Sequence, residues 1–283
     1  FERKGGQGFR PDRGFDMKSY NEVFRNLKSR EEGALVAFTV IGDPDYKTSL
    51  EVAKKIVDAG ADIFELGIPF SDPIADGKTI QGADVRALEN GMNTDLVFQF
   101  INDLRKYTDV PIGLLAYYNL VYQRGIGRFY QDAKKAGVNS ILIADLSIEE
   151  AEPVIPVSKK NGVDTVFMVS QLSDDNRIKK ITSASNGFIY LVSRLGVTGT
   201  GDYLQKSTLS FIKKVRKFTN KPLCVGFGIS TPQHVNDIIK AGADGAIVGS
   251  AIVDFIGKNV QDKNKMLNEI QNYVKAMKDA TRY

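Results

Sequence analysis

The sequence has 283 residues, of which 42% are hydrophobic and 25% are charged, as expected for one large α/β domain with a sizeable core. The net charge of +4 is small and the basic residues are spread along helix-like patterns, which gives little support to nucleic-acid binding. No apolar run approaches the roughly 18 to 20 residues that cross a bilayer, so we expect a cytoplasmic protein without a membrane partner.

The chain has one cysteine and one histidine, Cys224 and His234. Cys224 lies in the apolar stretch PLCVGF and is predicted to be a small core residue. His234 follows STPQ in what resembles a first helical turn, and we expect it at the surface. These counts exclude Cys–His pairs, Ser–His–Asp triads and His-rich metal sites, so acid–base chemistry falls to carboxylates, Tyr or Lys.

Residues 1–16 are rich in glycine and charge and show no hydrophobic periodicity, and we expect a disordered or added extension there. The remaining residues, 17–283, are predicted to form a single domain. Helix-like patterns at 19–30 and 264–280 stand at its two ends. The first is expected to cap the bottom of the fold and the second to complete its outer layer.

Four segments have the same sequence pattern, in which a glycine ends a helix-like stretch and a short apolar run follows. The glycines are Gly60, Gly137, Gly162 and Gly242. Eight apolar runs are predicted as parallel strands buried on both faces: 34–41, 62–68, 111–117, 140–145, 164–169, 187–192, 222–228 and 245–250. Alternation with helices predicts a (β/α)₈ barrel with an additional N-terminal helix. An open doubly wound sheet is the alternative, but no GxGxxG follows the first strand.

Glu65 stands inside the second predicted strand, in the second half of DIFELG. Side chains alternate along a strand, so Phe64 and Leu66 share the face that suits the helix layer, and Glu65 turns inward. Its late position places it near the C-terminal mouth, where such barrels carry their active sites. A carboxylate removed from water has a raised pKa and suits acid–base catalysis near neutral pH.

Asp72 and Asp76 follow Glu65 on a loop that also holds Pro69 and Pro73. Each aspartate alone fits an ordinary turn, but within reach of Glu65 one of them could accept a substrate N–H.

Glycines and a serine end the last two predicted strands, in VGFGIS and VGSA. Backbone N–H groups and a helix N-terminus there would hold an anion, at the usual phosphate position of these barrels. Residues 193–205, with three spaced glycines, have the composition of a lid. Tyr190 lies just before the lid and is predicted to point inward, either as a core residue or as a donor to a ligand.

The motifs FELGIPFSDPIADGKTIQ, PIGLLAYYN, SRLGVTG, VGFGIS and GAIVGSAIV occur in this order. With their spacing they closely resemble the tryptophan synthase alpha subunit family, from about Tyr20 to about Gly257. The resemblance implies a carbon–carbon lyase of tryptophan biosynthesis. It would cleave indole-3-glycerol phosphate to indole and glyceraldehyde 3-phosphate, without cofactor or metal. It also implies an alpha2beta2 complex with a beta subunit that carries pyridoxal phosphate.

The family motifs assign roles to individual residues. Glu65 would be the general acid and base, Asp76 would hold the indole N–H, and Tyr190 would support them. The apolar slot for indole would be formed by Phe38, Leu115, Tyr117, Leu142 and Ala144. The remaining substrate-binding residues, with backbone N–H groups for the phosphate, would be Gly199, Phe227, Gly228, Gly249 and Ser250. Asp72 and Pro73 would lie near the beta-subunit interface.

Two other functions stay open from the sequence. A barrel of this kind could mainly bind and activate a partner enzyme, although intact Glu65 and Asp76 argue against that. A phosphoribosyl isomerase would explain the glycine loops but not the motif PFSDPIADG.

Overall fold

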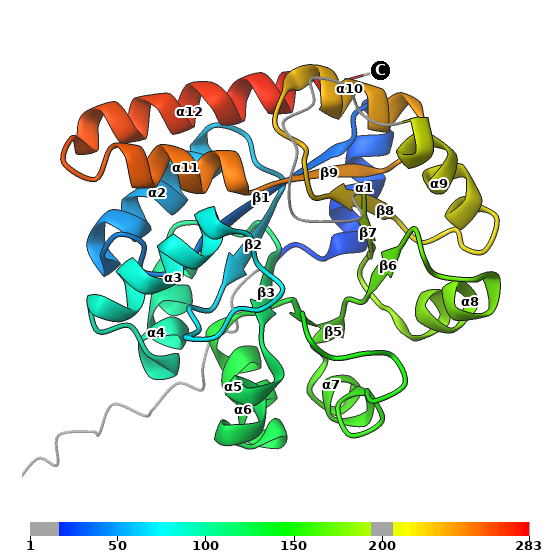
Figure 1. Ribbon diagram of the computed structural model, residues 1–283, viewed down its shortest axis with the longest axis horizontal. Helices are drawn as coiled ribbons and strands as arrows, with labels where there is room; N and C mark the ends of the chain where they lie inside the picture. The colour runs from blue at the N-terminus through cyan, green and yellow to red at the C-terminus, as the bar shows by residue number, and fades with distance from the viewer. Residues whose placement is uncertain (1–16, 194–205, 283) are drawn as a thin grey trace, which may run out of the picture.

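The computed structural model describes residues 17–193 and 206–282. Within them the chain forms nine parallel strands surrounded by helices (Figure 1). The strands follow the sheet order β5-β4-β3-β2-β1-β9-β8-β7-β6. They are β1 (Ala34–Val40), β2 (Ile63–Gly67), β3 (Ile112–Ala116), β4 (Ser140–Ile143), β5 (Asp164–Thr165), β6 (Met168–Ser170), β7 (Ile189–Val192), β8 (Leu223–Gly226) and β9 (Gly245–Val248).

The two ends of this order, β5 and β6, belong to one continuous stretch of chain. Between them, the Val166 N–H donates to the carbonyl of Ile141 at 3.1 Å, and the Phe167 carbonyl accepts from the N–H of Tyr190 at 3.2 Å. The same stretch therefore reaches β4 on one side and β7 on the other, which closes the ring. The predicted (β/α)₈ barrel is confirmed and the open sheet was wrong, while the fifth predicted strand is split in two.

Except for α1, the helices of the described residues form the outer layer of the barrel (Figure 1). They are α1 (Tyr20–Lys28), α2 (Tyr46–Asp58), α3 (Lys78–Glu89), α4 (Thr94–Arg105), α5 (Tyr118–Arg124), α6 (Ile126–Ala136), α7 (Ile155–Asn161), α8 (Asp175–Ala184), α9 (Lys206–Arg216), α10 (Pro232–Lys240), α11 (Ser250–Lys258) and α12 (Lys263–Asp279). The four predicted helix-ending glycines all have positive φ, between 60° and 102°. Glycine adopts this conformation without steric cost, so each helix ends where the sequence predicts.

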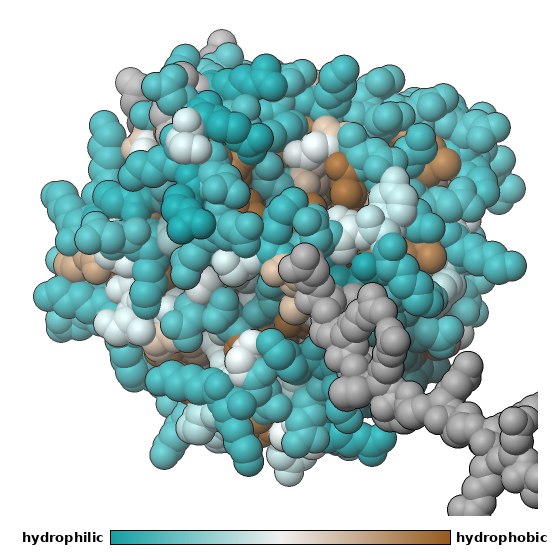
Figure 2. Space-filling model, turned by 180° about the vertical axis from the view of Figure 1, so that it is seen from behind, coloured by the Kyte–Doolittle hydropathy of each residue, from teal (hydrophilic) through white to brown (hydrophobic). Residues whose placement is uncertain are grey.

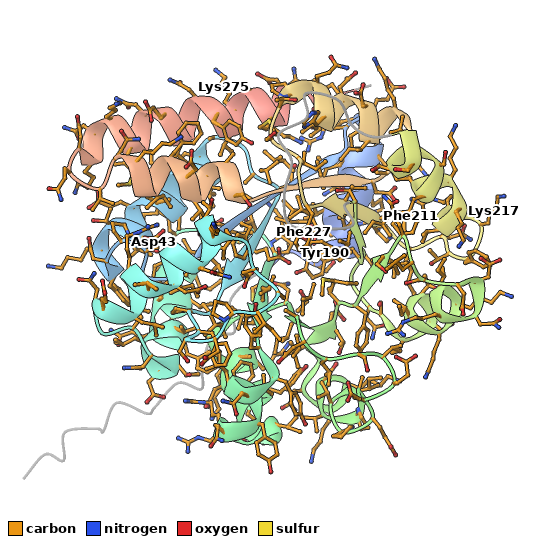
Figure 3. The ribbon with its side chains drawn as sticks, viewed as in Figure 1. Asp43, Tyr190, Phe211, Lys217, Phe227 and Lys275 are labelled. Carbon is orange, nitrogen blue, oxygen red and sulfur yellow. The ribbon has the colours of Figure 1, made fainter. Side chains whose placement is uncertain are left out.

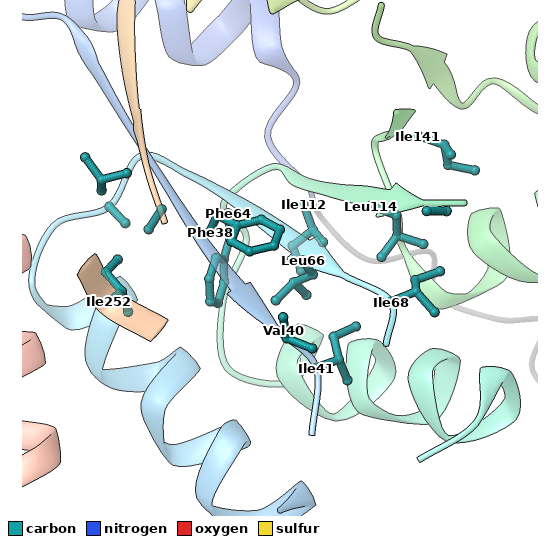
Figure 4. Packing of buried hydrophobic residues seen from close by; sticks show 14 of the residues in the cluster. Phe38, Val40, Ile41, Phe64, Leu66, Ile68, Ile112, Leu114, Ile141 and Ile252 are labelled. Atoms are coloured by element: carbon teal, nitrogen blue, oxygen red, sulfur yellow. The ribbon is translucent and has the colours of Figure 1, made fainter. Parts of the chain in front are cut away.

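The core has two parts, one on each side of the strands. Outward side chains such as Phe64, Leu66 and Leu114 pack against the helices (Figure 4). Inward side chains such as Ile63 and Leu142 fill the barrel. Burying each large apolar side chain contributes about 1.5 to 3 kcal/mol, so both layers hold the strands in register.

The helix α1 caps the bottom of the barrel, as predicted. Its Tyr20 hydroxyl lies 2.7 Å from Oγ of Ser140, and its ring meets the edge of Phe188. The C-terminal α12 packs on α2, α11 and α10 in the outer layer. The molecule seen from behind is largely hydrophilic with small hydrophobic areas (Figure 2). Among the described residues, no helix is long and apolar enough to cross a membrane.

The predictions for the cysteine and the histidine have different outcomes. Cys224 is fully buried on the inward face of β8, as predicted. The prediction of a surface histidine was wrong, because His234 is buried in the first turn of α10. Its position two residues after Pro232 indicated that His234 belongs to a first helical turn, but it did not indicate that the side chain lies on the buried side of the helix. The predicted extension at 1–16 lies outside the described residues.

Candidate active site

Glu65 points into the barrel from β2 and is only 3% exposed. In the strand register it lies beside Phe38 of β1 and Gly113 of β3. Its Oε2 atom is buried and has no hydrogen-bond partner among the described residues. Burial raises the pKa of Glu65 to about 8, and the negative charge of Asp76 adds to the shift. The carboxyl group is therefore neutral over most of the physiological range.

Asp76 lies in the loop between β2 and α3 and is held by Tyr117 from the end of β3. The Tyr117 hydroxyl donates to Oδ2 of Asp76 at 2.6 Å and accepts the Ala75 N–H at 3.1 Å. Burial raises the pKa of Asp76, and the hydrogen bond from Tyr117 opposes that shift. Burial and the hydrogen bond to Asp76 raise the pKa of the Tyr117 phenol. The pair therefore keeps the negative charge on Asp76 and the proton on Tyr117.

Tyr190 points inward from β7, as predicted, and lies against the end of β8 (Figure 3). A Cβ atom on Gly226 would overlap the Tyr190 hydroxyl, so the residue facing this ring must be glycine. Burial and the negative charge of Glu65 raise the pKa of Tyr190 well above its ordinary value. The phenol therefore stays protonated and can donate a hydrogen bond into the barrel mouth.

Phe227 and Gly228 follow β8 in a turn with positive φ, of 67° and 80°. Phe227 is 43% exposed, and its ring meets the Tyr190 ring edge-on with centroids 6.0 Å apart. A large side chain in the left-handed region is uncommon and concentrates at functional sites. The turn therefore presents an aromatic ring beside Tyr190.

Gly249 and Ser250 form the N-terminus of α11, with Gly249 as the capping residue. The first N–H groups of a helix have no acceptor within the helix, and its dipole favours an anion there. A Cβ atom on Gly249 would lie 2.9 Å from the Phe38 ring, and Phe38 is paired with Glu65. The two predicted halves of the site therefore lie at the same end of the barrel.

The residues predicted to form an apolar slot all lie on inward positions of the strands or just after them. Leu142 belongs to the inner core cluster, and the partly buried Leu115 and Ala144 pack against it. Phe38 and Tyr117 are buried as well. The predicted lid from residue 194 onward, with Gly199, lies outside the described residues.

Asp72 and Pro73, predicted near a partner interface, lie on the exposed part of the loop between β2 and α3. The Ser71 hydroxyl donates to Oδ2 of Asp72 at 2.5 Å. The next side chain after Pro73, that of Ile74, is 84% exposed. This stretch therefore presents an apolar residue to the surroundings, beside the loop end that holds Asp76.

Two polar residues at the site were not singled out from the sequence. Ser193, at the end of β7, donates its hydroxyl to the Gly226 carbonyl at 2.7 Å and also contacts the Phe227 carbonyl. Asp84 of α3 is buried and accepts from the Phe70 N–H. The helical period that buries Ile80, Ala83 and Ala87 also buries Asp84, and this signal could have found it.

A metal site is not indicated in the described part of the chain. Within residues 17–193 and 206–282, no group of three or more His, Cys, Asp and Glu side chains is placed to hold an ion.

Comparison with known proteins identifies the family. The family model for the tryptophan synthase alpha chain matches residues 24–282. A tryptophan synthase alpha chain of Methanothermobacter thermautotrophicus is 48% identical over 268 residues, which cover 94% of this chain and 98% of the relative. One of Methanoregula boonei is 47% identical over 249 residues, covering 88% and 94%.

A solved structure of the tryptophan synthase a2b2 complex of Pyrococcus furiosus contains a chain with the same fold. It superposes with a TM-score of 0.82 at 36% identity, covering 87% of this chain and 98% of that one. The similarity in sequence and in fold thus extends over nearly the full length of these relatives. The chain therefore belongs to the tryptophan synthase alpha chain family, a family of enzymes.

Proposed function

We propose that this chain cleaves indole-3-glycerol phosphate to indole and glyceraldehyde 3-phosphate, as a carbon–carbon lyase of tryptophan biosynthesis. Residues 17–283 would form the catalytic domain, with 1–16 as an extension outside it. The observation that carries the proposal is Glu65, a buried carboxyl group at the barrel mouth with a pKa of about 8 and one oxygen that finds no hydrogen-bond partner within residues 17–193 and 206–282. A group of this kind can both give and take a proton near neutral pH.

The reaction needs two proton transfers at neighbouring carbon atoms, and Glu65 can carry out both. Neutral Glu65 first gives its proton to the ring carbon that bears the side chain. The resulting carboxylate then takes the proton of the adjacent glycerol hydroxyl, so that this carbon becomes the aldehyde. The electron pair of the breaking carbon–carbon bond returns to the indole ring. Glu65 ends in its neutral form, which closes the cycle.

Asp76 would accept the indole N–H and stabilise the positive charge that develops on the ring after its protonation. The hydrogen bond from Tyr117 fixes the direction of one Asp76 oxygen and leaves the other free to face the ring. Tyr190 would support this arrangement as a donor, because its raised pKa keeps it protonated.

The substrate would lie between the two halves of the barrel mouth. The apolar slot for the indole ring is assigned to Phe38, Leu115, Tyr117, Leu142 and Ala144. The phosphate is assigned to the turns after β8 and β9, with Phe227, Gly228, Gly249 and Ser250, and to Gly199 by its match to the family motif. A helix N-terminus and glycine turns bind phosphate through backbone N–H groups, which needs no cationic side chain.

A beta subunit is the proposed protein partner. The Pyrococcus furiosus relative is described as part of an a2b2 complex with mutual activation. In this chain the exposed loop with Asp72, Pro73 and Ile74 would contact the partner, and the same loop ends at Asp76. Binding at its tip could therefore adjust the position of a reacting group.

An assay of indole release from indole-3-glycerol phosphate, with and without a beta subunit, tests the proposal. We expect cleavage by the chain alone and a faster reaction with the partner. Glu65→Gln should lower kcat by about 10² to 10⁴-fold, the usual value of general acid–base help. The same Glu→Gln change at exposed Glu89 is the control and should have no effect. Full activity of Glu65→Gln, or a chain that only activates the beta subunit, would contradict the lyase mechanism.

A further inference from the structure

Asp84 is a buried carboxyl group close to the candidate site that the proposed reaction does not use. It lies on α3 and is 4% exposed. Its neighbours on the buried face of the helix are apolar, namely Ile80, Ala83 and Ala87. A carboxyl group among such residues costs stability unless it is neutral or well paired, so its position needs an explanation.

The two oxygens of Asp84 have different surroundings. Oδ1 accepts the backbone N–H of Phe70 at 3.4 Å. Oδ2 is buried and has no hydrogen-bond partner among the described residues. Phe70 lies three residues after the end of β2 at Gly67, in the loop that carries Asp76. Asp84 therefore fixes the first end of this loop.

The other end of the loop is fixed by Tyr117, and Phe70 joins the two. The ring of Phe70 stacks on the ring of Tyr117, with centroids 5.0 Å apart and planes inclined by 23°. The Tyr117 hydroxyl in turn contacts Ala75 and Asp76. One continuous set of contacts thus runs from Asp84 through Phe70 and Tyr117 to Asp76.

Charges around Asp84 are mostly negative. Asp76 on the loop and Asp43 after β1 both raise the pKa of Asp84, and Asp84 in turn raises the pKa of the Tyr117 phenol. Asp43 is paired with Arg86 of α3, through hydrogen bonds of 2.6 and 2.9 Å, so its charge is balanced. Burial raises the pKa of Asp84 to about 7, and the charge of Asp76 adds to the shift. Two neighbouring carboxyl groups in a dry site cannot both ionise without a large cost.

We propose that Asp84 is a positioning residue, whose neutral carboxyl group anchors Phe70 and leaves the negative charge of the Asp76–Asp84 pair on Asp76. The inference rests on the proposed function, in which Asp76 holds the substrate N–H as an anion. Ionisation of Asp84 would set two negative charges against each other and push the part of the loop that carries Asp76 away from α3.

Two variants and a control test this role. Asp84→Asn keeps an acceptor for Phe70 but cannot ionise, whereas Asp84→Leu removes the acceptor. Glu89→Gln removes an exposed carboxyl from the same helix and serves as the control. Hydrogen exchange of the backbone N–H groups between Phe70 and Asp76, corrected for intrinsic rates, is measured from pH 6 to 9 without substrate. The kcat and KM for indole-3-glycerol phosphate are measured over the same range.

In the wild-type protein and Glu89→Gln we expect exchange of the loop amides to become faster above pH 7. In Asp84→Asn it should stay slow up to pH 9, with KM close to the wild-type value at pH 6. Asp84→Leu should show fast exchange at every pH and a KM raised about 5- to 10-fold, the effect of one lost hydrogen bond.

The role is overturned if exchange of the loop amides in Asp84→Asn becomes faster above pH 7 as it does in the wild-type protein. It is also overturned if Asp84→Leu has the slow loop exchange and the KM of the wild-type protein at pH 6. Because the exchange experiment needs no substrate, its outcome is independent of the activity. Absence of cleavage in every variant, combined with the expected exchange pattern, would reject the proposed function and keep Asp84 as the anchor of the loop.

Discussion

Tyr117 and Asp76 are 41 residues apart in the chain, yet the phenol of one donates to the carboxylate of the other at 2.6 Å. The contact joins the end of β3 to the loop after β2 and also holds the Ala75 N–H. Hydrogen bonds to a charged group are worth about 1.5 to 3 kcal/mol, more than most others. Tyr117 therefore orients the carboxylate proposed to face the substrate.

Replacing Tyr117 by Phe should lower kcat/KM for indole-3-glycerol phosphate about 10- to 100-fold, because the orienting hydrogen bond is lost while the ring remains. Steady-state kinetics measure the change. Tyr122→Phe removes a phenol from an exposed position and should leave the kinetics unaltered. Equal kcat/KM values for the two variants would show that the Asp76 carboxylate needs no orientation by Tyr117.

The proposed order of proton transfers predicts the pH dependence of the reaction. Glu65 must be neutral at the start, so kcat/KM should fall as the pH rises through about 8, the pKa of this residue. On the acid side it should fall when Asp76 becomes protonated. A profile of kcat/KM from pH 5 to 10 checks both limbs. A rate that keeps rising to pH 10 would mean that the reaction starts from ionised Glu65.

Glu65 should also make the folded protein less stable at alkaline pH. Its pKa is raised from 4.5 to about 8, so between these values the folded protein binds a proton that the unfolded chain releases. The free energy of unfolding must then decrease as the pH rises through this window.

Glu65→Gln stays neutral and should be more stable than the wild-type protein by about 2 to 4 kcal/mol at pH 9, with a smaller difference at pH 5. Urea unfolding at the two pH values measures it. If the stability difference between the variant and the wild-type protein is the same at pH 5 and pH 9, the Glu65 carboxyl group is solvated in the folded state.

Gly226→Ala should be destabilising by about 1 to 3 kcal/mol, since its new Cβ atom would overlap the Tyr190 hydroxyl and push this ring out of place. We also expect weaker catalysis, because Tyr190 borders the candidate site. Gly127→Ala in α6 meets no atom within 4 Å and should instead stabilise the fold by roughly 0.5 to 1 kcal/mol. Thermal unfolding of both variants compares them directly, and equal melting temperatures would contradict the close packing of Tyr190.

The strand pattern carried much of the information about the barrel and about Glu65. Alternation along DIFELG was enough to turn Glu65 inward, because the neighbouring Phe64 and Leu66 need the helix layer. Local patterns did not reveal the split of the fifth strand, since Val166 and Phe167 continue the apolar run without a break. Whether a residue of this stretch pairs with the strand on one side or with the strand on the other depends on how the barrel closes, which is a property of the whole ring.

Contacts between distant segments could not be predicted from local patterns either. The Tyr117–Asp76 hydrogen bond joins two segments whose approach depends on the register of β2 and β3. His234 was expected at the surface because its turn was recognised but the buried side of that turn was not. The roles assigned to the site residues stay predictions, which the variants above address.

The pairing of the first strand with the last has a consequence for protein synthesis. β1 and β9 lie side by side, with Ala34 opposite Gly245, so the ring can close only after β9 has left the ribosome. Glu65 and Asp76 emerge well before Phe227, Gly249 and Ser250. A nascent chain thus carries its reactive carboxyl groups long before it has a place to hold an anion, and ribosome-bound fragments that end before β9 should be unable to retain the substrate.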